Sequence, residues 1–244
     1  YYIYIMVTFS DELDSVEHEI KPLISTEDNL PPKLYILPVQ GRPIYPGIFT
    51  PLMVNPGDDT KVIEKAWESG GFVGIVLTRE EKDNPTMPDL YEVGTVAHII
   101  KKMNLPDGGL NVFISTVKRF RIRKAIQNSS PMSCAVEYLE DEENDTFEVK
   151  ALTRALISEM KDISENNPLF SEEMRLNMVN IDQSGKIADF VTSILNVERA
   201  EQQKILEMTN VRQRLEKVLV FIKKEQEVLR VQKKIQCELN ENIQ

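Results

Sequence analysis

The chain has 244 residues, of which 41% are hydrophobic and 28% charged, a composition typical of a globular protein with one or two domains. Its formal net charge of −10 argues against general binding to polyanions. Two cysteines and two histidines, spread along the chain, give neither a disulfide framework nor the spacing of metal ligands. We therefore expect a reducing compartment and no metal site.

Residues 1–32 form an amino-terminal extension to which the sequence assigns no defined fold. Tyr1 to Phe9 are mostly apolar, but this stretch is too short to span a bilayer and lacks the charged flank of a signal peptide. We therefore expect no membrane partner. The first residue is Tyr1 rather than Met, as in a fragment or a processed chain.

Residues 33–140 read as a β-rich domain. Leu34 to Val39 has the composition of a strand and precedes a loop rich in proline and glycine, residues 41–47. Asp58, Asp59 and Thr60 are capping residues for a helix that ends at Gly70-Gly71, and a buried strand follows from Phe72 to Leu77. The apolar face predicted for that helix consists of Val62, Ile63, Ala66 and Trp67.

Residues 89–123 are the most informative stretch, because two apolar runs flank the pair Asp107-Gly108. Asp-Gly between such runs favours a β-hairpin with a type I′ turn, in which both central residues adopt positive φ. A basic segment, residues 118–124, ends the second strand with cationic and apolar residues in alternation. The pattern predicts a strand with one cationic and one buried face.

After Leu139 an acidic run, residues 140–145, separates the β-rich part from a helical bundle, residues 146–210. Apolar residues then recur at three- and four-residue steps up to the break at Asn166-Asn167-Pro168. A second helix is predicted to start near Ser171. A third has an apolar face of Ile187, Phe190, Val191, Ile194 and Leu195.

Residues 211–244 contain neither proline nor glycine and predict one long helix. Several apolar residues keep near-heptad spacing along it, as in a coiled coil. The first half has two interpretations that the sequence leaves open: packing on the bundle, or pairing with another chain. The candidate oligomerisation residues are Leu215, Val218, Ile222 and Leu229.

Several of these segments resemble the amino-terminal domain of Lon, the ATP-dependent protease. The resemblance spans residues 34–240 and departs at Ser115-Thr116, where such sequences usually end in glycine. Its most specific residues are Leu37-Pro38, Tyr45-Pro46-Gly47, Pro51-Leu52, Asp89-Leu90-Tyr91-Glu92-Val93-Gly94-Thr95-Val96-Ala97, Leu105-Pro106-Asp107-Gly108 and Arg119. Later matches are Asn180-Ile181-Asp182, Ile187-Ala188-Asp189-Phe190, Gln203-Lys204-Ile205-Leu206-Glu207, Arg214-Leu215-Glu216-Lys217-Val218-Leu219 and Glu227-Val228-Leu229.

The resemblance implies an α+β fold, with a PUA-like β-barrel over residues 33–140, an all-α bundle over 146–210 and a long helix over 211–244. It further implies a non-catalytic region that binds unfolded or damaged proteins and supports assembly of a hexamer. The implied location is the cytoplasm, or the mitochondrial matrix in a eukaryote.

Catalysis is not expected from these residues. A P-loop requires a glycine, four further residues and then Gly-Lys-Ser/Thr, whereas the only Gly-Lys pair here, Gly185-Lys186, is followed by Ile187 and has no glycine at position 180. We expect no cofactor in this region. The resemblance places an AAA+ ATPase module with ATP and magnesium, and a Ser-Lys protease, beyond Gln244.

Exposed apolar side chains are the predicted substrate-binding residues. The loop after the first strand supplies Ile44, Tyr45 and Phe49, and the hairpin supplies Met103 and Leu105. Methionine suits contacts with varied unfolded segments because its side chain is flexible and polarizable. An alternative for each residue is a place in the barrel core.

Two other functions stay open on the sequence alone. Residues 119–124 would serve an RNA-binding barrel through phosphate contacts, although nucleic acid is not our expected partner. A stand-alone adaptor of the same barrel family is the other alternative, for which the long final helix has no evident use.

Overall fold

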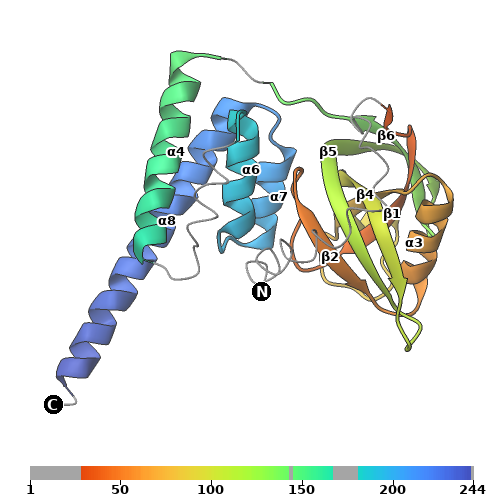
Figure 1. Cartoon of the computed structure of the whole chain (residues 1–244), viewed down its shortest axis with the longest axis horizontal. Helices are drawn as coiled ribbons and strands as arrows, with labels where there is room; N and C mark the ends of the chain where they lie inside the picture. The colour runs from red at the N-terminus through yellow and green to blue at the C-terminus, as the bar shows by residue number, and fades with distance from the viewer. Residues whose placement is uncertain (1–28, 143–144, 167–180, 243–244) are drawn as a thin grey trace, which may run out of the picture. The chain divides into compact units, whose positions relative to one another are not determined.

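The computed structural model describes residues 29–142, 145–166 and 181–242. The chain divides into two compact units, the first formed by residues up to Glu140 together with Arg199–Thr209 and the second by Asp141–Glu198 and Asn210–Gln244. Strands make up most of the first unit and helices the second, so the predicted α+β class is confirmed (Figure 1). The chain thus returns to the first unit inside the range predicted as a helical bundle, residues 146–210.

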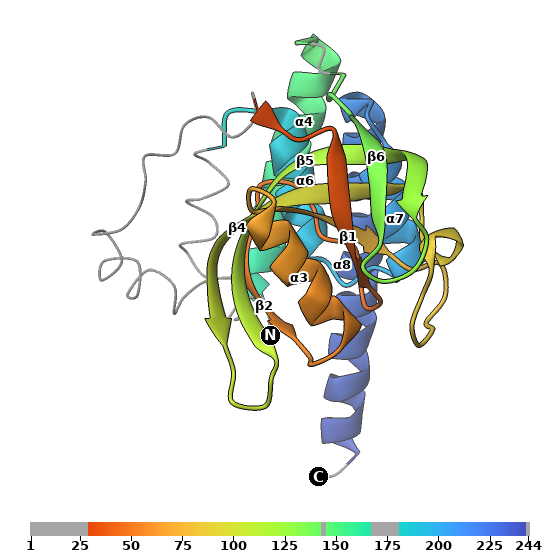
Figure 2. The same cartoon turned by 90° about the vertical axis from the view of Figure 1, so that its right-hand side faces the viewer.

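The first unit is a β-barrel. Its strands are β1 (Lys33–Val39), β2 (Phe49–Val54), β3 (Phe72–Leu77), β4 (Val93–Asn104), β5 (Leu110–Gln127) and β6 (Ser133–Tyr138). They lie in the order β2-β5-β4-β3-β1-β6, and β5 also pairs with β6, which closes the barrel. Among these six strands, only β1 and β3 pair in parallel; the other pairs are antiparallel. Figure 2 shows the long β5 running beside β4 and then beside β6.

Helix α3 (Asp58–Glu68) contributes Val62, Ile63 and Ala66 to a core with β1, β3, β4 and β5. Trp67, the fourth residue of the predicted apolar face, is 41% exposed, and its ring faces the Lys102 ammonium. The helix ends as predicted, with Gly71 N–H donating to the Ala66 carbonyl. A short 3-10 helix (Met87–Asp89) precedes β4.

The hairpin between β4 and β5 is confirmed, but the predicted type I′ turn is wrong. Gly108 has a φ of +88°, whereas Asp107 does not adopt positive φ. Gly108 N–H donates to the Leu105 carbonyl over 3.1 Å, and Gly109 N–H donates to the Asp107 carboxylate over 2.8 Å. A three-residue loop with proline first and a left-handed glycine last explains this geometry.

Thr116, at the position where the family pattern was expected to depart, fastens the loop before β2. Its hydroxyl donates to the Tyr45 carbonyl and accepts from Ile48 N–H, each over 2.7 Å. A glycine there would lack both hydrogen bonds. The departure from the family pattern at Thr116 therefore has a structural role.

Helix α7 (Arg199–Glu207) belongs to the barrel unit, where two side chains of the barrel donate to carbonyl groups of α7 and two side chains of α7 donate to carbonyl groups of the barrel. The Arg119 guanidinium, 3% exposed, donates to the Leu206 carbonyl over 2.7 Å. The three others are Tyr45 to Gln202 O over 2.5 Å, Gln203 to Val93 O over 3.0 Å and Arg199 to Thr78 O over 2.5 Å. These bonds explain why this helix packs with the strands.

The second unit contains α4 (Phe147–Asn166), α6 (Ser184–Ile194) and α8 (Val211–Glu241). The described part of α4 ends at Asn166, the first residue of the predicted break; the rest of that break and the helix predicted near Ser171 lie outside the described residues. Asn210 caps α8 by accepting from Gln213 N–H over 3.0 Å. Figure 1 shows α8 continuing well past the end of α4.

A buried arginine joins the elements of the second unit. Arg214 of α8 is fully buried and donates to both carboxylate oxygens of Asp141, over 2.5 and 3.1 Å. It also contacts the Asp189 carboxylate at 3.4 Å and the Gly185 carbonyl at 3.3 Å. Because a buried cation requires paired anions and acceptors, this cluster fixes α8 against α6 and the segment entering the unit.

Candidate functional site

Strands β2, β5 and β4 present two faces of opposite character. Alternate residues of β5, Leu110, Val112 and Ile114, are at most 3% exposed and lie in the core. The residues between them lie on the opposite side of the sheet, because successive side chains of a strand point to opposite faces. We call that side the outer face. From β4 through β5 to β2 its rows are His98–Ser115–Phe49, Lys101–Phe113–Pro51 and Met103–Asn111–Met53.

The outer face is largely apolar and partly exposed. Met53 is 77% exposed and Met103 is 37% exposed, whereas Phe49 and Phe113 are half-buried. Registered pairs of a sheet lie next to one another, so these side chains form one continuous surface rather than scattered exposed residues. Such a surface on a small domain is typical of an interaction site.

His98 lies at one end of the outer face. Its ring stacks on Phe72 of β3 with centroids 4.9 Å apart and an interplanar angle of 27°. Partial burial lowers the pKa of the His98 imidazole from its usual range, because burial disfavours the charged form. His98 is therefore mostly neutral at pH 7 and adds to the apolar character of the face.

The structure separates the predicted substrate-binding residues into two groups. Phe49 and Met103 lie on the outer face, and Leu105 is half-buried in the hairpin turn. Ile44 and Tyr45 are 5% and 1% exposed, so the prediction that they form an accessible patch is wrong. Their loop is pinned to the barrel by Thr116 and by α7, contacts between distant parts of the chain that the local sequence does not show.

Met53, Phe113 and Asn111 were missed by the sequence analysis. Met53 lies two residues after Pro51, in a strand that was not predicted as an element. Asn111 is a polar residue in an apolar run. The strand period of two in β5 was the available signal, since it separates Asn111 and Phe113 from the core residues beside them.

Two cations of the predicted cationic strand, residues 118–124, are paired with carboxylates. Lys118 pairs with Glu140, and Arg123 pairs with Glu137. Arg119 is buried against α7 rather than exposed, so the predicted cationic face is wrong at that position. These pairings leave less free positive charge for phosphate contacts and weaken the case for an RNA-binding stripe.

Three of the four predicted oligomerisation residues lie inside the second unit. Leu215, Val218 and Ile222 are 0% exposed, and Leu229 is half-buried. Because these residues are internal, the interpretation as packing on the bundle holds for the first half of α8. A different stripe is exposed in the second half: Val228 (48%), Val231 (44%), Ile235 (50%) and Leu239 (57%).

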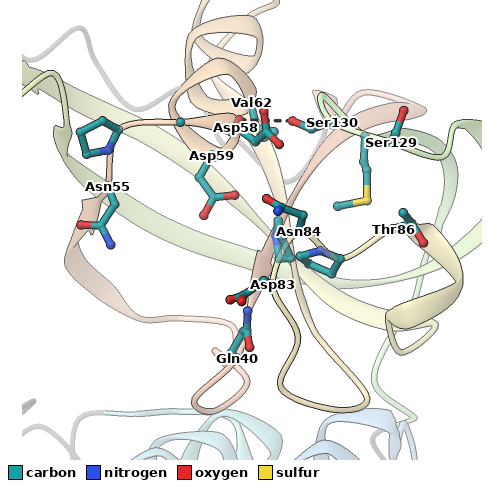
Figure 3. A pocket seen from close by; sticks show the side chains of 15 residues that line it. Gln40, Asn55, Asp58, Asp59, Val62, Asp83, Asn84, Thr86, Ser129 and Ser130 are labelled. Atoms are coloured by element: carbon teal, nitrogen blue, oxygen red, sulfur yellow. Dashed lines mark hydrogen bonds between the residues drawn. The ribbon is translucent and has the colours of Figure 1, made fainter.

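A cleft of about 730 Å³ lies at one end of the barrel. Figure 3 shows Asp59 projecting into it from the start of α3. Burial, and then the neighbouring Asp58 carboxylate, raise the pKa of Asp59. The lining residues are Pro38, Gln40, Asn55, Pro56, Gly57, Asp58, Asp59, Val62, Asp83, Asn84, Pro85, Thr86, Ser129, Ser130 and Met132. An excess of carboxylates in an open cleft does not define a ligand.

The described residues hold no cluster of histidine, cysteine, aspartate and glutamate suited to a metal ion. Cys134 is buried, which raises the pKa of its thiol to about 12, so this residue is a core side chain rather than a nucleophile. Among the helices in residues 29–142, 145–166 and 181–242, none has both the length and the apolar character needed to cross a membrane.

The fold is that of amino-terminal domains of Lon proteases. It matches the N-terminal domain of the Mycobacterium avium complex Lon protease with a TM-score of 0.62 at 19% identity, covering 78% of this chain and 98% of that one. The Lon N-terminal domain protein from Xanthomonas campestris matches with a TM-score of 0.56 at 18% identity, covering 77% of this chain and 97% of that one.

Sequence comparisons define the family. The model of the ATP-dependent protease La (LON) substrate-binding domain matches residues 33–224, and the chain belongs to this family. It is 56% identical to the Lon protease of Treponema pallidum over 94% of this chain and 39% identical to that of Leptospira interrogans over 96%. These alignments span only 26% and 28% of the two relatives.

Proposed function

We propose that this region binds unfolded or damaged proteins for a Lon-type protease, and that the outer face is the binding surface. The observation that carries the proposal is the largely apolar outer face, on which Met53 and Met103 are exposed to either side of Asn111. Flexible methionine side chains adapt to segments of different sequence, which a quality-control protease requires. Membership of the substrate-binding family supports the same function.

The test is a titration of the chain with a permanently unfolded protein, reduced and carboxymethylated, with the same protein in its folded state as comparison. Wild type should bind the unfolded form selectively. The double variant Met53→Ser and Met103→Ser should bind at least about fivefold more weakly, because it replaces apolar contact surface with hydroxyl groups.

Ile126→Ser is the matched control, since Ile126 is 54% exposed on the same strand β5 but lies outside the outer face. It should bind as wild type. Equal binding by wild type and by the methionine double variant would place the substrate surface elsewhere.

We also propose that α8 supports assembly of the hexamer, through the exposed stripe Val228, Val231, Ile235 and Leu239. Residues spaced three or four apart lie on one side of a helix, where they can pair with a second helix. The first half of α8 lends rigidity, because it is packed into the second unit.

The matched pair Ile235→Glu and Cys237→Glu tests the assembly proposal. Both positions are exposed and two residues apart, which separates them by about 200° around the helix. Ile235→Glu should shift the full-length protein toward smaller species in sedimentation velocity, whereas Cys237→Glu should not. Equal sedimentation of the two variants would show that the exposed stripe does not take part in assembly.

The remaining expectations concern the whole protein, and we propose them by extension from the relatives named Lon protease. The full-length protein is an ATP-dependent serine endopeptidase whose ATP and magnesium bind a separate ATPase module. It acts in the cytoplasm, or in the mitochondrial matrix in a eukaryote. Hydrolysis of an unfolded protein by the full-length chain, with and without ATP, tests this assignment.

A further inference from the structure

The outer face contains one polar side chain between its two exposed methionines. Asn111 of β5 pairs in register with Met53 of β2 and with Met103 of β4. Its amide oxygen Oδ1 is buried, and within the described residues nothing donates a hydrogen bond to it. A buried acceptor without a donor is unfavourable, and a bound molecule that supplies an N–H would remove that penalty.

The surroundings of Asn111 restrict which molecule can supply the donor. Met53 and Met103 beside it and Phe113 in the next row are apolar, so the bound molecule must combine apolar groups with an accessible N–H. A docked α-helix does not, because all but its first four backbone N–H groups are bonded within the helix. An extended segment of unfolded chain carries an N–H at every residue except proline.

The amide can become accessible on binding. Met53 is 77% exposed and therefore little constrained by its neighbours, and methionine has three rotatable side-chain bonds. Rotation of the methionines, which flank Asn111 in its row, would open the surface on either side of the amide and place their thioethers beside the incoming segment. The backbone of the three strands need not change.

We propose that Asn111 makes the outer face selective for extended polypeptide. One backbone N–H of the bound segment donates to Asn111 Oδ1, while apolar side chains on either side contact Met53 and Met103. This inference rests on the proposed substrate-binding function and adds a specificity-determining residue to it. The occupant is an extended apolar segment of an unfolded protein, not an amphipathic helix.

Two peptide probes test the inference by fluorescence anisotropy. The first is a capped peptide of alternating valine and threonine, which favours an extended chain, and the second is a stapled amphipathic helix of leucine and lysine. Asn111→Leu should bind the extended peptide roughly three- to tenfold more weakly, as the net loss of one hydrogen bond predicts. The same variant should bind the helix as well as wild type or better, because it adds apolar surface.

Ser115→Leu is the matched control, since Ser115 lies on the same strand and face two rows away. It should strengthen binding of both peptides or leave it unchanged. Thermal unfolding of Asn111→Leu should occur at or above the wild-type temperature, because the substitution removes an unsatisfied buried group. A loss of affinity would then not reflect unfolding.

Single N-methylation of the extended peptide supplies a double-mutant cycle. Methylation at the residue that donates to Asn111 should weaken binding to wild type but hardly affect binding to Asn111→Leu. Weakening by the same factor in both proteins, at every position, would overturn the inference. So would equal or tighter binding of the extended peptide by Asn111→Leu.

Failure of this inference is distinguishable from failure of the proposed function. If the methionine double variant loses binding and Asn111→Leu does not, the outer face binds substrate without the amide. If the methionine variant also binds as wild type, the outer face is not the substrate-binding surface. A concentration-dependent dimer that dissociates on adding the extended peptide, and is weakened by the methionine variant, would identify a second copy as the occupant.

Discussion

The two faces of β2, β5 and β4 differ although they come from the same strands. The inner face carries Val112 and Ile114, fully buried against α3 and the other strands. The outer face carries Met53 and Met103, which remain exposed, with Asn111 between them. A shift of one residue along a strand therefore separates side chains that determine stability from side chains available for binding.

The largest expected effect comes from the inner face. Ile114→Ala removes a fully buried side chain from the core and should lower the free energy of unfolding by about 2–5 kcal/mol. Urea denaturation followed by circular dichroism measures this. Ser115→Ala, the next residue on the opposite face, should change stability by less than about 0.5 kcal/mol. Equal losses for the two variants would contradict the assignment of the faces.

An intermediate effect is expected at Tyr45, which the sequence assigned to substrate binding and the structure places in the interior. Tyr45→Phe removes the hydroxyl that donates to the Gln202 carbonyl and should cost about 1 kcal/mol of stability. Affinity for an unfolded protein should not change. Weaker binding with unaltered stability would show that Tyr45 belongs to the binding surface after all. Tyr35→Phe, at a half-buried tyrosine of β1, is the matched control.

The smallest expected effect is a pH dependence at His98. Its pKa is lower in the folded protein than in the unfolded chain, where it is about 6.5, so the unfolded state binds more protons near that pH. The stability contributed by neutral His98 is therefore present above pH 6.5 and is lost as pH falls toward the folded-state pKa. His98→Gln should lose less stability than wild type over the same range.

An NMR titration of the His98 ring measures the same property directly. The midpoint should lie below that of a histidine in an unfolded peptide. A midpoint at or above 6.5 would show that the ring is solvated, and the outer face would then be less apolar than the stacking on Phe72 indicates.

Prediction from sequence succeeded where neighbouring residues decide the structure. Alternation identified the strands of the hairpin, and the helical period identified α4. The turn was harder, because Asp-Gly suits more than one geometry. Pro106, one residue earlier, determined a three-residue loop with positive φ only at Gly108.

Long-range contacts account for the errors at the candidate site. Tyr45 and Arg119 have the composition of an exposed loop and a cationic strand, yet both bind backbone carbonyl groups of α7. Their partners lie 157 and 87 residues away along the chain. A local pattern contains no information on such partners, so burial could not be assigned to either residue.

Within the single helix α8, too, a local pattern does not determine which residues are buried. Its apolar residues keep similar spacing throughout, but Val211, Leu215, Val218 and Ile222 are buried in the second unit, where α8 packs on α4 and α6, while Val228, Val231, Ile235 and Leu239 are exposed. Periodicity defines a face of the helix and not what covers it.

The sequence by itself determined the α+β class, the hairpin, the long final helix and the resemblance to Lon, because each follows from the order and spacing of neighbouring residues. Only the tertiary structure decided that Ile44 and Tyr45 are interior, that α7 packs with the barrel, and that Met53, Asn111 and Met103 meet in one row. Those outcomes depend on strand register and on contacts between distant segments, which are fixed when the chain packs to bury its apolar surface.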